Sequence, residues 1–370
     1  MVKATEEEAG LHARVLSHFP VAPGARVEAL GNGLINQTFA VTELAPGGRR
    51  FVLQRVNPLF PPSIHDNILA VTNRLRDAGL TTPRLVPTHE GDPCLQLARD
   101  PASATSASGA PEVWRLMTFV EGVSFDVVGS PGQARAAGAL IARFHRALDG
   151  LTHPFAALRT GVHDTPRHLE TLARATTQHL AHRLHADVEP LATAIAAAAA
   201  ALPLLPVLAP RVCHGDLKFN NVLFAGAAPV EREQAVCLID LDTIGPMSLA
   251  FELGDAWRSW CNRSGEDDVE AALDLGIFEA SFDGYSTALG ASLDEPERRA
   301  LLLGPEWISL ELAARFAADA LNESYFGWDP KRFPDRGAHN LVRARGQLSL
   351  HRAFVATRAT RARLLALAPQ

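Results

Sequence analysis

The sequence of 370 residues has few cysteines, and their spacing matches neither a disulfide framework nor a metal-binding motif. Its four cysteines are widely spaced, and no two of them form a C-x-x-C pair. Such an arrangement gives no sign of a disulfide framework. Cys213 and Cys237 stand in apolar, strand-like surroundings. We therefore interpret them as small buried residues of a reduced protein.

Basic tracts and long apolar runs are also missing. The net charge is −6, and basic residues do not alternate with aromatic ones, so nucleic-acid binding is not expected. Residues 1–10 are acidic rather than basic, which does not fit a signal peptide. The alanine-rich stretch 191–202 is too short to span a bilayer and is followed by prolines. These absences predict a soluble, cytoplasmic protein without a membrane partner.

What remains is the composition of a globular protein, with 47% hydrophobic and 21% charged residues. A chain of this length is too long for one ordinary core and suits two lobes. Helical spacing of apolar residues marks 5–19, 63–78, 134–148 and one or two helices within 164–202. Strands are expected over 38–41, 51–56, 84–87, 95–98 and 114–120, and residues 100–111 have the composition of a flexible loop.

The most informative stretch is a polar loop followed by two short apolar runs, 222–224 and 235–239, which predict a hairpin. The loop before the first run carries Asp216 and Asn221, and the second run ends at Asp240. Because the two open ends of a hairpin lie together, we expect these three side chains to converge.

The chemistry of these side chains is that of phosphoryl transfer. A carboxylate such as Asp216 can orient a hydroxyl nucleophile or accept its proton. The oxygens of Asn221 and Asp240 are hard ligands that suit Mg²⁺, which takes its other ligands from water and phosphate. A loop Asp, an Asn on Mg²⁺ and a second Asp on Mg²⁺ make up the kinase set. The alternative is a polar hairpin whose acids are merely solvated.

Residues 214–221 read His-Gly-Asp-x-x-x-x-Asn, which is similar to the protein-kinase catalytic loop His-Arg-Asp-x-x-x-x-Asn. With Gly215 in place of the Arg, the stretch resembles the aminoglycoside phosphotransferase and choline kinase superfamily, which phosphorylates small molecules. The resemblance implies an α+β, two-lobed, protein-kinase-like fold that binds ATP between its lobes. We expect a small β-rich N-lobe over residues 1–119, with a nucleotide-binding sheet and one helix. The larger, mainly helical C-lobe would cover 120–370, with the catalytic loop, the metal site and the acceptor-binding helices.

The expected N-lobe offers candidates for contacts with ATP. Gly31 and Gly33 form a Gly-x-Gly turn between apolar segments, where the backbone can approach phosphates closely. Arg55 ends a strand where kinases carry the Lys that grips the α- and β-phosphates. An ordinary hairpin turn and a surface arginine are the alternatives. Backbone groups from Thr118 to Val120 are expected to read adenine at an interlobe hinge.

The helix over 63–78 departs from the kinase pattern, because it has no Glu to pair with the strand cation. Asp66 or Asn67 is the nearest substitute. In the helix over 134–148, His145 lies beside the apolar face, and we interpret it as a packed core residue. A further helix is expected to open at residues 253–258, with Asp255 near its N-terminus. The superfamily resemblance implies that this Asp braces the catalytic loop.

Several segments together resemble the N-acetylhexosamine 1-kinases, members of the same superfamily that phosphorylate the anomeric hydroxyl of N-acetylglucosamine or N-acetylgalactosamine. They are Gly31–Phe39, Val52–Asn57, Asp216–Val222, Ile239–Thr243 and a C-terminal set at 310–326. The resemblance implies that Asp216 is the catalytic base and that Lys218 lies near the transferred phosphoryl group or the sugar. Asn221 and Asp240 would hold Mg²⁺, and Asp242 would matter less. Gly215 differs from the Asn expected in many members.

Other functions stay open at this point. The acceptor within the same superfamily could be choline, homoserine or an aminoglycoside instead of a sugar. A nucleotide-binding pseudokinase is favoured only by the missing helix Glu and opposed by the intact loop residues. A protein kinase is disfavoured, because no Asp-Phe-Gly triplet is present and no Ala-Pro-Glu triplet follows the catalytic loop.

Overall fold

The computed structural model describes residues 6–31, 35–98, 111–158 and 161–368, which form two compact units. The first unit contains residues 1–121 and 150–158, and the second contains 122–149 and 159–370. The expected lobe boundary at residues 119 and 120 lies two residues before the first break. The segment 150–158, expected in the C-lobe, groups with the first unit. Gly33 and nearly all of the expected loop 100–111 lie outside the described residues.

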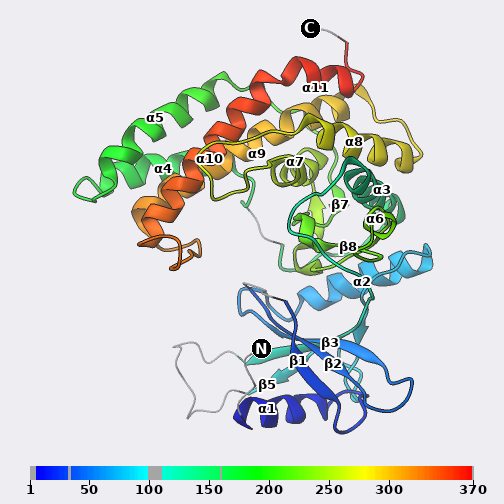
Figure 1. Ribbon diagram of the computed structural model, residues 1–370. Coiled ribbons are helices and arrows are strands. Elements are labelled where there is room, and N and C mark those ends of the chain that lie inside the picture. The colour runs from blue at the N-terminus through cyan, green and yellow to red at the C-terminus, as the bar shows by residue number, and fades with distance from the viewer. Residues whose placement is uncertain (1–5, 32–34, 99–110, 159–160, 369–370) are drawn as a thin grey trace. The chain divides into compact units, whose positions relative to one another are not determined.

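The first unit is built on an antiparallel sheet in the order β1-β2-β3-β6-β4, with β5 also paired to β6 (Figure 1). Its strands are β1 (Arg26–Ala29), β2 (Gln37–Thr42), β3 (Arg50–Val56), β4 (Leu85–Val86), β5 (Leu95–Leu97) and β6 (Glu112–Thr118). Strand β3 lies in the middle, with Thr38 of β2 and Arg115 of β6 both paired to Gln54.

Two helices cover opposite faces of this sheet, α1 (Glu6–Leu16) and α2 (Ile64–Asp77) (Figure 1). Side chains alternate between the faces of a strand, so Phe51 and Leu53 point to the same face. Both are buried in one apolar cluster with Val15 of α1 and Trp114 of β6. This cluster fixes which residues of β3 face α1 and which face α2.

The segment 150–158 joins the first unit through one side chain of α2. The Asn67 amide donates from Nδ2 to the backbone oxygen of Ala156 over 2.8 Å, and its Oδ1 accepts from the Ala156 N–H over 3.0 Å. His153 Nε2 lies 3.1 Å from the same Oδ1. Asn67 is buried, so these bonds satisfy polar atoms that water cannot reach.

The second unit is mainly helical. Its helices are α3 (Pro131–Leu148), α4 (Thr165–Gln178), α5 (His185–Ala201), α6 (Pro229–Arg232), α7 (Leu249–Trp260), α8 (Leu275–Leu289), α9 (Glu295–Asn322), α10 (Arg336–Ala356) and α11 (Arg358–Leu364). Two short antiparallel pairs complete it, β7 (Arg211–Cys213) with β10 (Gly245–Met247), and β8 (Val222–Phe224) with β9 (Ala235–Leu238). Two 3₁₀ turns, η2 (Phe219–Asn221) and η3 (Leu241–Thr243), lie next to these strands.

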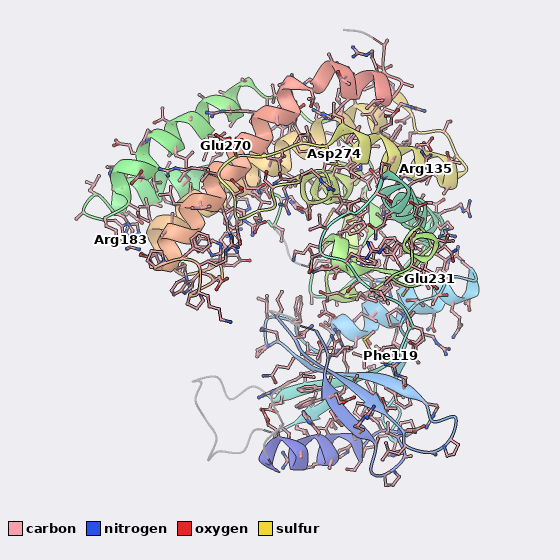
Figure 2. The ribbon with its side chains drawn as sticks, viewed as in Figure 1. Phe119, Arg135, Arg183, Glu231, Glu270 and Asp274 are labelled. Carbon is pink, nitrogen blue, oxygen red and sulfur yellow. The ribbon has the colours of Figure 1, made fainter. Side chains whose placement is uncertain are left out.

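The helices α3 and α8 pack at backbone contact distance. A Cβ added at Gly138 of α3 would lie 2.0 Å from the backbone oxygen of Ser281, and one added at Gly284 of α8 would lie 2.0 Å from that of Arg135. Larger side chains at either position would force the helices apart. The side chain of Arg135, labelled in Figure 2, also forms an ion pair with Asp283 of α8.

The expected α+β fold class is confirmed: the first unit is small and built on an antiparallel sheet, and the second is larger and mainly helical. The hairpin predicted at 222–224 and 235–239 is also confirmed. The helix expected to open at residue 253 in fact begins at Leu249, after Ser248, whose hydroxyl accepts from the N–H of Ala250. None of the helices in the described part of the chain combines the length and apolar character needed to cross a membrane.

Candidate active site

The loop between β7 and β8 carries the residues singled out from the sequence, and its first turn requires glycine. Gly215 has φ +82°, and a Cβ there would lie 2.6 Å from the backbone oxygen of Thr243. Asn is among the residues that tolerate a positive φ, but it too has a Cβ. The glycine at this position is therefore explained by the backbone, without reference to a substrate.

Hydrogen bonds join this loop to the far end of the β8–β9 hairpin. His214 Nε2 lies 2.8 Å from the backbone oxygen of Ile239. The backbone oxygen of His214 accepts a hydrogen bond from Thr243 Oγ1 over 2.8 Å. The N–H of Ile239 donates to the backbone oxygen of Asn221 over 2.9 Å. Residues 214–221 and 239–243 are thus held side by side, within one unit, as the hairpin prediction required.

Three of the expected catalytic and metal-binding residues lie on this loop. Lys218 Nζ donates to Asp216 Oδ2 over 3.2 Å. Desolvation opposes the charge of Lys218, but the attraction of Asp216 and Asp255 outweighs it and raises the pKa of the ammonium. The buried Asn221 side chain donates from Nδ2 to the backbone oxygen of Asp216 over 2.8 Å. This bond fixes the amide, so Oδ1 is the atom that can serve as a ligand.

Asp240 follows β9 in a left-handed conformation, with φ 62° and ψ 63°. A residue with a Cβ adopts this conformation at a cost of order 1 kcal/mol or more, and such residues are concentrated at functional sites. Asp240 is exposed, whereas Asp242, two residues later, is buried. The structure therefore presents the carboxylate of Asp240, and not that of Asp242, at the surface of this loop.

The brace of the catalytic loop is Glu252 of α7, a residue that the sequence analysis did not single out. Its Oε1 accepts from the backbone N–H of His214 over 2.8 Å, and its Oε2 accepts from that of Gly215 over 3.0 Å. The side chain is buried, which by itself would raise its pKa. His145, His214 and the backbone N–H of His214 outweigh this effect, so the pKa of Glu252 is lowered.

The role implied for Asp255 is therefore corrected. Because α7 begins at Leu249, Asp255 lies inside the helix and not near its N-terminus. Its Oδ1 accepts from Arg258 Nε over 2.8 Å, one turn further along the helix. Burial opposes its charge, but Arg258, His163 and Lys218 lower its pKa. Asp255 thus contributes a negative charge near Lys218, while Glu252 holds the backbone.

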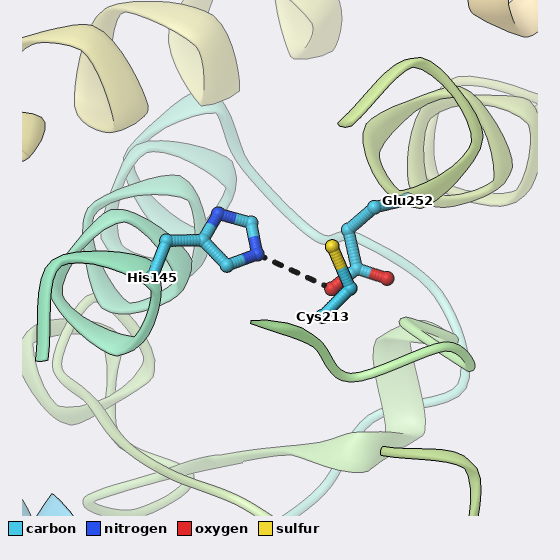
Figure 3. Close-up of side chains that lie close together, drawn as sticks. All are labelled: His145, Cys213 and Glu252. Atoms are coloured by element: carbon cyan, nitrogen blue, oxygen red, sulfur yellow. Dashed lines mark hydrogen bonds and ion pairs between the residues drawn. The ribbon is translucent and has the colours of Figure 1, made fainter. Parts of the chain in front are cut away.

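Behind the loop, Glu252 lies beside His145 and Cys213 (Figure 3). His145 Nε2 is 3.4 Å from Glu252 Oε1, and its Nδ1 is 3.0 Å from the Tyr285 hydroxyl. The three residues have the composition of a metal site, but both oxygens of Glu252 already accept from backbone N–H groups. Burial also raises the pKa of the Cys213 thiol well above its usual value, which keeps it protonated. The interpretation of His145 as a packed core residue is confirmed.

In the first unit, Arg55 forms an ion pair with Glu112 of β6 and lies over the ring of Trp114, 6.0 Å from its centroid. The partner of Arg55 is thus on the neighbouring strand and not on α2. Asn67, one of the two substitutes considered on α2, binds the segment 150–158 as described above. A role of Arg55 in nucleotide binding stays a prediction.

In the segment that is expected to read adenine, two backbone N–H groups already donate hydrogen bonds within the first unit. The N–H of Thr118 donates to the backbone oxygen of Arg84 over 2.9 Å, and the N–H of Phe119 donates to that of Arg50 over 3.2 Å. A backbone N–H contact with adenine in this segment would therefore come from Val120. A contact by Thr118 would use its carbonyl. Gly31 has φ +72°, which suits glycine at the turn after β1.

Solved structures with the same fold include an aminoglycoside phosphotransferase from Alicyclobacillus acidocaldarius. It is 18% identical, with a TM-score of 0.61, over 99% of this chain and 98% of that chain. A microcompartment-associated aminopropanol kinase is 17% identical, with a TM-score of 0.59, over 95% of this chain and 98% of the other. An amicoumacin kinase in complex with AMP-PNP, Ca²⁺ and Ami is 13% identical, with a TM-score of 0.60, over 93% of each chain.

The model of one protein family matches residues 26–289, which is well over half of the chain. The match includes the sheet of the first unit as well as the loop 214–221 and the brace Glu252. The chain therefore belongs to the phosphotransferase enzyme family, APH.

Proposed function

We propose that this phosphotransferase moves the γ-phosphoryl group of ATP to a hydroxyl group of a small molecule. The observation that carries the proposal is the pair of Asp216 and Lys218. Both lie on a loop in which Glu252 accepts hydrogen bonds from two backbone N–H groups. Asp216 would align the acceptor hydroxyl and take its proton. Lys218 would offset the negative charge that spreads over the transferred phosphoryl oxygens. The pseudokinase alternative gives this pair no role.

Asn221 and Asp240 suit a Mg²⁺ ion. Because the amide of Asn221 is fixed, its Oδ1 is the atom that can bind the ion. The exposed Asp240 follows Ile239, whose N–H donates to the backbone oxygen of Asn221. Both are hard oxygen donors, and two protein ligands are the usual number for Mg²⁺ that is shared with phosphates. When bound, the ion would neutralise charge on the β- and γ-phosphates. Gly31, Gly33, Thr118 and Val120 remain the predicted nucleotide contacts, with Arg55 as a further candidate.

For the acceptor, the first candidate is the anomeric hydroxyl of an N-acetylhexosamine or a related sugar. The charges of both Lys218 and His163 act on Asp255, and His163 lies 3.2 Å from Glu311 of α9. One turn along α9, Arg315 lies over the rings of Tyr325 and Phe326, at 5.8 and 5.4 Å from their centroids.

The ring and the guanidinium of this cluster support a sugar as the acceptor. Tyr325 is 60% exposed. An exposed ring next to a guanidinium offers an apolar face and hydrogen-bond donors, which suit a neutral molecule rich in hydroxyl groups. A positively charged acceptor would be repelled by Arg315. The second candidate is an amino alcohol, which is supported by the similarity to the aminopropanol kinase and by the carboxylates of Asp255 and Glu311, and opposed by Arg315.

A panel of acceptors, assayed by ADP release with ATP and Mg²⁺, tests the proposal. N-acetylglucosamine or N-acetylgalactosamine should stimulate ADP release, and their 1-O-methyl glycosides should not be phosphorylated. The product should have no reducing end until mild acid hydrolysis restores it. Turnover of choline or homoserine without turnover of free sugar would end the sugar proposal and leave the kinase proposal intact. A cytoplasmic location of the protein is part of the same proposal, because ATP is found there.

A further inference from the structure

A row of three polar side chains crosses the sheet of the first unit. Thr38 of β2, Gln54 of β3 and Arg115 of β6 are paired in register. The Gln54 amide donates from Nε2 to Thr38 Oγ1 over 3.0 Å, and its Oε1 accepts from Arg115 Nε over 2.8 Å. The amide orientation is therefore set by its two neighbours, with the NH₂ group directed toward β2.

This row lies on the face of the sheet opposite to Arg55. Residues of β3 alternate, so Arg55 shares the face of Phe51 and Leu53, which pack with α1. Gln54 lies on the other face, which α2 covers (Figure 1). Arg115 of β6 is directly opposite Gln54 in the register, so its side chain lies on this face as well.

In kinases the lysine that contacts the α- and β-phosphates stands on this middle strand and pairs with a Glu of the helix that covers the sheet. Its side chain must therefore point to the face of that helix. By this criterion the corresponding residue of β3 is Gln54, and not Arg55. The positive charge on this face comes from the adjacent strand, where Arg115 is 1% exposed.

The row also lies next to the glycine-containing turn. The backbone N–H of Leu30 donates to the backbone oxygen of Thr38 over 2.9 Å, so Thr38 is adjacent to the turn that begins at Gly31. Thr38 of β2 thus connects the two: its backbone oxygen bonds to the residue before Gly31, and its hydroxyl accepts from the NH₂ group of Gln54.

We propose that Gln54 binds a phosphate oxygen of ATP through Nε2, and that Arg115 is a positioning residue that holds its amide. An amide nitrogen has two hydrogens, so the bond to Thr38 leaves one for the nucleotide. Arg115 fixes the direction of the amide through Oε1 and adds a positive charge behind it, in place of the ammonium of a lysine. The inference rests on the proposed ATP-dependent function and names a contact for it.

The test is a comparison of Gln54→Glu with Gln96→Glu in the full chain, by calorimetric titration with Mg·ATP and with adenosine. Gln54→Glu keeps an oxygen for Arg115 but replaces the NH₂ group by a second oxygen, which repels phosphate. The Kd for ATP should rise at least tenfold, as expected for the loss of a hydrogen bond to a charged group, which is worth about 1.5–3 kcal/mol. The Kd for adenosine, which has no phosphates, should stay within about twofold.

Gln96→Glu is the matched control, because it makes the same change of an amide to a carboxylate at an exposed position of β5 in the same sheet. Its Kd for ATP and for adenosine should both equal those of the wild type. An unchanged ATP affinity in Gln54→Glu overturns the inference, and so does an equal loss of ATP and adenosine binding, which indicates a structural role. A loss of ATP binding in Gln96→Glu as large as that in Gln54→Glu also overturns it, because the added negative charge alone would then explain the effect. If the wild type binds no Mg·ATP, the proposed function itself fails.

Discussion

The side-chain amide of Asn221 donates a hydrogen bond to the backbone carbonyl of Asp216 over 2.8 Å. One residue expected to bind the metal thus closes the loop that presents the residue expected to act as base. Because Asn221 is buried, this bond replaces contacts with water that the amide has lost. The geometry of the two functional groups is therefore coupled, and a change at Asn221 affects both.

Asp216→Asn should lower kcat by about 10²–10⁴-fold, because a neutral amide cannot take the proton of the acceptor hydroxyl. The affinity for Mg·ATP should stay close to that of the wild type, since the expected nucleotide contacts lie in the first unit. Steady-state kinetics together with titration of ATP check this prediction. A variant that retains more than half of the wild-type kcat would show that Asp216 is not the base.

Asp240→Ala should weaken the metal-dependent binding of nucleotide, and activity of Asn221→Ala should be partly restored by raised Mg²⁺ or Mn²⁺. The reason is that each variant removes one oxygen ligand of the ion. Asp242→Ala is the comparison, because Asp242 is buried and should affect the metal dependence less. ADP release measured as a function of metal concentration distinguishes these three variants. Equal losses in all of them, independent of the metal, would contradict the ligand roles.

Glu252→Gln should loosen the catalytic loop, because an amide has one oxygen for the two backbone N–H groups of His214 and Gly215. Removing one partner from buried charge-assisted bonds costs about 3 kcal/mol of the free energy of unfolding. Amide hydrogen exchange at 214 and 215 should become faster, and kcat should fall with little change in the affinity for ATP. Asp255→Asn leaves the bonds to Glu252 in place, so it should not change the exchange at these two positions. Unchanged exchange in Glu252→Gln would show that the carboxylate does not brace the loop.

The pH dependence of the stability of the first unit should reflect the titration of Glu43. The Arg49 guanidinium, together with the N–H groups of Ala22 and Arg49, lowers the pKa of this carboxyl to about 2. A lowered pKa stabilises the fold above the unfolded value of about 4.5, and the stabilisation is lost as the pH falls toward about 2. Arg49 is exposed to solvent, which screens the ion pair, so we expect only a small contribution to the free energy of unfolding.

Thermal unfolding of Glu43→Gln and wild type, measured from pH 7 down to pH 3, checks this sign. The wild type should melt at a higher temperature than Glu43→Gln at pH 7. The difference between the two melting temperatures should shrink below pH 4.5, because the Glu43 carboxylate stabilises the fold less as the pH falls. A difference that grew on acidification would mean that the ion pair with Arg49 does not set the pKa of Glu43.

The sequence determined much of the second unit by itself, because the decisive information is local. The order of Asp216, Asn221 and Asp240 around two short apolar runs specifies a hairpin whose ends meet, and the structure has that hairpin. The helix of His145 was equally readable, since apolar residues at helical spacing mark one buried face.

Only the tertiary structure decided which partners these elements have. Nothing near Glu252 in the sequence indicates that its carboxylate reaches back 37 and 38 residues to two backbone N–H groups. On β3, alternation places Gln54 and Arg55 on opposite faces, but only the packing of α1 and α2 tells which face is which. Partner choice depends on how distant segments pack, and a pattern within one segment has no access to it.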